Sequence, residues 1–96
     1  MATDRIQAID ALLVRAEEAH GAFEATELNG VYDTEWPPWY AAWAVEHGIG
    51  ALIGRDVSAD ELAQFLVTTN AEFERTVPRH TEPWSGYTAR RIADDL

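Results

Sequence analysis

The side chains best suited to chemistry include Glu17, His20 and Glu24, which lie at intervals of three and four residues along one predicted helix. Glu17 and His20 match the Glu-x-x-His half-motif of helical-bundle metal proteins, in which a carboxylate and an imidazole one turn apart face the same ion. A di-iron site of that kind needs a second Glu-x-x-His segment, and the sequence has none. We therefore interpret His20 as a residue on or beside the buried face, paired with a carboxylate such as Glu24 or with a tyrosine.

A second acid and imidazole, Glu46 and His47, close an aromatic run from Val31 to Gly48. If the two predicted helices are neighbours, His20 and His47 could meet, which is the minimal geometry for a mononuclear metal site or an acid–base pair. The candidate ligand-binding residues are His20, Glu24, Tyr40, Trp43, Glu46 and His47. The alternative is that His47 complements the dipole at the end of its helix. We favour this alternative because no nucleophile or oxyanion-stabilising group accompanies the pair, and we predict no catalytic residue, metal ligand or cofactor.

The aromatic side chains have three possible uses. They can form the core of a small bundle, supply the anchors of a protein interface, or line a pocket for a flat or cationic ligand with Glu46 or Glu35 as counter-charge. Four tryptophans exceed what a chain of 96 residues can readily bury, so core plus interface is the economical interpretation. The candidate interface residues are Trp36, Trp39 and Trp84, and they predict a homodimer.

The elements that must position these residues are helices. Apolar residues step by threes and fours along the first segment, Asn29-Gly30 is typical of a helix stop, and Pro37 suits a first helical turn. No stretch alternates with the period of a strand. We predict a single all-α domain over residues 1–96, a compact array of about four helices at roughly 4–28, 37–47, 59–75 and 83–94, with a possible short turn at 49–53.

The third of these helices carries the clearest local signal. Ser58 with Glu61 three residues later is a capping box, in which each side chain satisfies a backbone amide of the other residue. We therefore expect the segment from Gly54 to Val57 to be a non-helical break before the helix begins. Val77-Pro78 predicts the end of the helix.

Composition excludes several classes of protein. The net charge of −10 is spread along the chain, so it disfavours binding to nucleic acids and anionic membranes. The sequence has no cysteine, which excludes disulfides and thiolate metal sites. We find neither a signal peptide nor a membrane-spanning segment, and take the cytoplasm as the default location.

The chain resembles a group of small helical bacterial proteins. The resemblance rests on Tyr32-Asp33, Trp36-Pro37, Trp39-Tyr40-Ala41 and Glu46-His47-Gly48, preceded by Glu18-Ala-His20-Gly21 and followed by Glu82-Pro83-Trp84. It implies an all-α bacterial protein with the acid, imidazole and aromatic cluster as its most interesting region, and it brings no activity with it.

These observations leave three hypotheses for function. The first is a non-enzymatic module that self-associates or binds a partner through its aromatic surface. The second is a small-molecule or metal-binding protein, and under this hypothesis an enzyme, with a His, Glu and aromatic site. The third, suggested by charge alone, is an acidic mimic of nucleic acid that occupies a basic partner.

Overall fold

Five helices account for most of the chain in the computed structural model, which describes residues 2–31, 33–76 and 82–96. They are α1 (Ala2–Glu27), α2 (Trp36–Glu46), α3 (Ile49–Ile53), α4 (Ala59–Thr76) and α5 (Trp84–Asp95). The described residues contain no strand, so the predicted all-α class is confirmed. Each helix begins and ends within two residues of its predicted bounds, and the possible turn at 49–53 is the short helix α3. Val77 and Pro78, the predicted end of the third long helix, lie outside the described residues.

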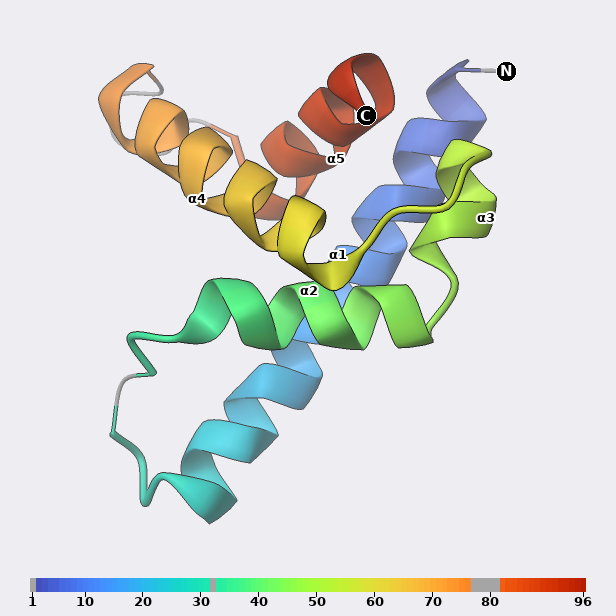
Figure 1. Ribbon diagram of the computed structural model, residues 1–96. Coiled ribbons are helices and arrows are strands. Elements are labelled where there is room, and N and C mark those ends of the chain that lie inside the picture. Colours follow the sequence, from blue (N-terminus) through green and yellow to red (C-terminus); the bar gives the residue numbers. More distant parts are fainter. Residues whose placement is uncertain (1, 32, 77–81) are drawn as a thin grey trace.

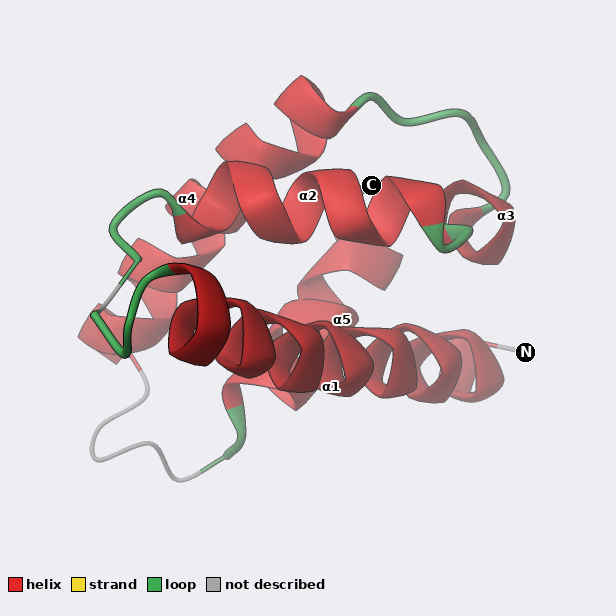
Figure 2. Ribbon diagram, turned by 90° about the horizontal axis from the view of Figure 1, so that it is seen from below, coloured by secondary structure: helices red, strands yellow, loops and turns green. Residues whose placement is uncertain are grey.

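The longest helix, α1, packs against three of the other helices. It packs most extensively against α5, while α2 packs on α4 and also crosses α1 (Figure 1). Figure 2 shows the connection after α1 turning back at one end of the molecule, so that α2 returns over α1. None of the described helices is both long and apolar enough to cross a membrane.

The core confirms the apolar pattern of the sequence. Ile9, Leu13 and Ala16 of α1 are fully buried, as their spacing predicts, and Leu62 and Leu66 of α4 belong to the same cluster of buried residues. The other members of this single cluster of buried residues are Leu12, Tyr40, Ala41, Ala44, Ile49, Ile53, Val57, Ala89 and Ile92. All five helices thus contribute to one core.

The chain reverses where the backbone adopts left-handed angles. Asn29 and Gly30 have φ angles of 54° and 81°, and the Gly30 amide donates to the carbonyl of Glu24 at 2.8 Å, so the predicted stop after α1 is confirmed. Gly54 ends α3 with a φ of 82°, an angle at which a side chain would be strained.

The start of α4 is only partly as predicted. The Glu61 amide donates to Ser58 Oγ at 3.1 Å, which confirms the cap. The Glu61 carboxylate binds the guanidinium of Arg55 at 2.6 Å instead of returning to the Ser58 amide, so the reciprocal half of the capping box was wrong. The Arg55 side chain also donates a hydrogen bond to the carbonyl oxygen of Leu96 at 3.0 Å. Arg55 therefore links the start of α4 to the residue that follows α5.

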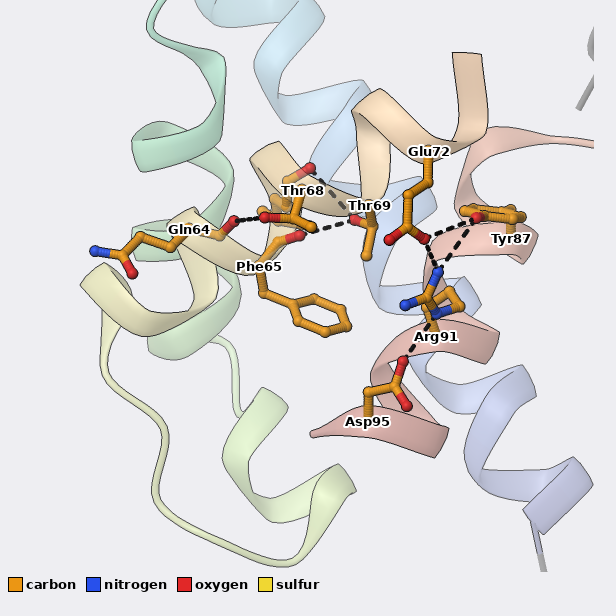
Figure 3. Close-up of polar contacts among 9 residues, drawn as sticks. Gln64, Phe65, Thr68, Thr69, Glu72, Tyr87, Arg91 and Asp95 are labelled. Carbon is orange, nitrogen blue, oxygen red and sulfur yellow. Dashed lines mark hydrogen bonds and ion pairs between the residues drawn. The ribbon is translucent and has the colours of Figure 1, made fainter. Parts of the chain in front are cut away.

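A polar cluster fastens α4 to α5. The Arg91 guanidinium of α5 pairs with Glu72 of α4, donates to Asp95 at 2.9 Å and contacts the hydroxyl of Tyr87 at 3.3 Å (Figure 3). The hydrogen bonds that Arg91 donates to Glu72 first, and then to Asp95 and Tyr87, raise the pKa of Arg91. This cluster joins α4 to α5, the helix whose first residue is Trp84.

Candidate ligand pocket

Side chains from four helices converge on a surface pocket of about 360 Å³. This volume falls at the lower end of the range of roughly 300–1,000 Å³ typical of small-molecule sites. The lining consists of Glu17, His20 and Glu24 from α1, Trp36 and Tyr40 from α2, Asn70 and Glu74 from α4, and Trp84 from α5. We call these residues the acidic aromatic pocket.

Three aromatic rings of the pocket contact one another edge to face. The ring centroids of Trp36 and Tyr40 are 5.4 Å apart, those of Trp36 and Trp84 5.6 Å, and those of Tyr40 and Trp84 5.5 Å. The interplanar angles lie between 78° and 87°. The indole nitrogen of Trp84 is buried and has no hydrogen-bond partner in the part of the chain that the structure describes. The trio therefore places ring surfaces of different orientation beside one hollow.

Three carboxylates make the pocket wall negative. Glu24 accepts a hydrogen bond from the Asp33 amide at 2.9 Å, and Glu74 accepts one from Asn70 at 3.4 Å. Partial burial, followed by the negative charge of Asp10 two turns earlier on α1, raises the pKa of Glu17. None of the described residues that line the pocket is an arginine, so no side chain of fixed positive charge in the lining offsets these groups.

His20 fixes one edge of the pocket rather than projecting freely into it. Its ring is buried against Trp39 and Tyr40, with centroids 4.8 and 4.9 Å away. The Nε2–H of His20 donates to Asp33 at 2.8 Å, and Asp33 also accepts the Glu35 amide at 2.9 Å. The hydrogen bond from His20 is the main reason that the pKa of Asp33 is lowered. The carboxylate partner of His20 is thus Asp33, while Glu24 binds the backbone of the same loop.

His47 lies elsewhere. It is exposed at the end of α2, stacks on Trp43 with a centroid separation of 3.7 Å, and donates from Nδ1 to the Trp43 carbonyl at 2.7 Å. Tyr40, which contacts His20, precedes His47 by seven residues, or about 10 Å along a helix. The structure does not bring the two histidines together.

The predicted site residues therefore separate into two groups. His20, Glu24 and Tyr40 line the pocket, together with Trp36 and Trp84, which the sequence had suggested for an interface. Trp43, Glu46 and His47 do not line it, and Trp39 packs on Phe23 at a centroid distance of 5.6 Å. Among the described residues, no three histidine, aspartate or glutamate side chains are grouped so that they could hold a metal ion.

Sequence reasoning missed part of the pocket. Asn70 and Glu74 are one turn apart on α4, and that spacing was the only local signal for them. The metal half-motif identifies Glu17 only as a partner of His20, although the spacing of Glu17, His20 and Glu24 places all three on one helix face. Comparison of the chain with protein-family models, with curated proteins and with solved structures gave no match.

Proposed function

We propose that the protein is a non-enzymatic binding protein that holds a small organic molecule in the acidic aromatic pocket. One observation carries this proposal: three aromatic rings and three carboxylates from four helices line the same hollow of about 360 Å³. Aromatic surface gives a ligand contact area, and a few placed polar groups give it orientation. The proposal includes a location in the bacterial cytosol, as composition and the resemblance led us to expect.

The proposal can be tested with four small probes of different charge: tetramethylammonium, benzylamine, benzyl alcohol and benzoate. The melting temperature of the wild type is measured with each probe and compared with those of Trp84→Leu, inside the pocket, and Trp43→Leu, outside it. A ligand that binds only the folded state raises the melting temperature. We expect at least one probe to stabilise the wild type and Trp43→Leu but not Trp84→Leu. Stabilisation by no probe, or equal stabilisation of both variants, contradicts the proposal.

Self-association is a second candidate function, favoured by a separate observation. All four tryptophans are only partly buried. Trp43 and the exposed His47 form one such aromatic surface at the end of α2, outside the pocket. This candidate is compatible with ligand binding because the two surfaces differ.

A further inference from the structure

We propose that the ligand of the acidic aromatic pocket is an organic cation whose charged group is a substituted ammonium. This inference rests on the proposed function, since it names the charge class of the molecule that the same pocket binds. Three independent features of the pocket support it: its rings, its carboxylates and its lack of a metal-binding geometry.

The rings favour a diffuse positive charge. The face of an indole or phenol ring attracts a cation within about 6 Å of its centroid, and tryptophan does so most strongly. Trp36, Tyr40 and Trp84 stand nearly perpendicular to one another, so a ligand beside one ring meets a second ring at a different angle. A substituted ammonium carries its charge on an apolar shell that can contact such rings and loses little hydration on doing so.

The carboxylates select the sign of the charge. Glu17, Glu24 and Glu74 come from two different helices and line the hollow, and an anion would be repelled by all three. Partial desolvation and the nearby charge of Asp10 moreover disfavour the negative charge of Glu17, although the side chain is exposed. A bound cation would offset the repulsion between Glu17 and Asp10.

A metal ion fits the pocket poorly. His20 and Glu24 are both engaged with the loop residue Asp33, at 2.8 and 2.9 Å. The described residues supply no cluster of three metal-binding side chains. The geometry thus suits a cation that is recognised by charge and ring contact rather than by coordination.

The deciding experiment compares choline with 3,3-dimethylbutan-1-ol, a neutral molecule of nearly the same shape in which carbon replaces nitrogen. Isothermal titration calorimetry on the wild type measures both affinities. We expect choline to bind at least tenfold more tightly, because only choline gains from the rings and carboxylates as a cation. Increasing salt should weaken choline binding, since part of the pocket is open to solvent.

Two variants assign the effect to the pocket. Glu17→Gln and Glu74→Gln should each lower the affinity for choline by about three- to tenfold. Glu18→Gln is the matched control, because Glu18 is exposed on the same helix, does not line the pocket, and changes the net charge equally. Circular dichroism is used to check that all three variants remain helical.

The outcomes separate the inference from the proposed function. Equal affinities for choline and its neutral analogue, or equal losses in the control and pocket variants, overturn the cation inference while a pocket that binds small molecules stands. Binding of benzoate or benzyl alcohol without any binding of choline does the same. If no probe binds at all, both the inference and the proposed function are overturned.

Discussion

At the scale of single residues, we expect the Glu17 carboxylate to lower the stability of the folded protein while it favours the binding of a cation. Partial burial and the charge of Asp10 raise its pKa, so the folded state disfavours the ionised carboxylate. We predict that Glu17→Gln stabilises the protein at pH 7, by up to about 0.5 kcal/mol because solvent screens a group this exposed. The same substitution should weaken cation binding, and this combination distinguishes a ligand-binding carboxylate from a structural one.

The pH dependence of this prediction has a definite sign. The cost of ionised Glu17 is present above its folded pKa, which is raised, and disappears as pH falls below the usual value of 4.5. The stability gained by Glu17→Gln should therefore be seen in chemical denaturation at pH 7 and vanish near pH 4. Glu18→Gln serves as the control. A destabilised Glu17→Gln protein at pH 7 contradicts this electrostatic account.

His20 and His47 should respond differently to substitution. His20 is buried, packs on two aromatic rings and donates to Asp33, whereas His47 is exposed. We predict that His20→Ala lowers the free energy of unfolding by about 1–3 kcal/mol, because Asp33 loses its donor. His47→Ala should change it by no more than about 0.5 kcal/mol. Urea denaturation measures both, and equal effects would contradict the structural role of His20.

At the scale of elements, the helices could be predicted because their signals are local. The apolar spacing of Ile9, Leu13 and Ala16, the Asn29-Gly30 stop and the Ser58 cap each depend on residues within a few positions of one another. The partners of charged side chains could not be predicted in the same way. Glu61 matched a capping box by spacing, but Arg55 competes for its carboxylate, and hydrogen bonds from Arg55 are the main reason that the pKa of Glu61 is lowered.

The cap of α4 provides a direct test of this local reasoning. Ser58→Ala removes the acceptor of the Glu61 amide and should cost about 1 kcal/mol. Ser58→Asp keeps an acceptor at the same position and should preserve most of the stability. Thermal denaturation of the two variants beside the wild type measures the difference. Equal stability of Ser58→Ala and the wild type would show that the hydrogen bond contributes nothing.

At the scale of the whole molecule, the pocket exists only because four helices meet. Glu17 and Glu24 share one helix face that the sequence reveals, but Glu74 and Trp84 reach them through the packing of α4 and α5. Arg91 and Asp95 have the local i, i+4 spacing, but the pair between Arg91 and Glu72 that joins those helices has no local signature. For the same reason the packing of Trp84 on Trp36 and Tyr40 could not be predicted from the sequence, while its predicted role at an interface stays a prediction.

The oligomeric state is a separate prediction at this scale. We expect a homodimer at micromolar concentration, formed through the partly buried tryptophans outside the pocket and burying on the order of 1,000 Å² or more. Light scattering across that concentration range measures the mass. Trp43→Ala should shift the equilibrium toward monomer, while a monomeric wild type throughout the range contradicts the prediction.

The central claim, that the acidic aromatic pocket binds an organic cation, is tested most directly by nuclear magnetic resonance. The four tryptophans provide four indole N–H signals, assigned by single Trp→Phe variants, and the protein is titrated with tetramethylammonium. Trp36 and Trp84 line the pocket and Trp43 does not, so Trp43 is a control within the same molecule. We predict saturable shifts of the Trp36 and Trp84 signals with little change at Trp43. Unchanged signals throughout, or shifts of Trp43 as large as those of the other two, would contradict the claim.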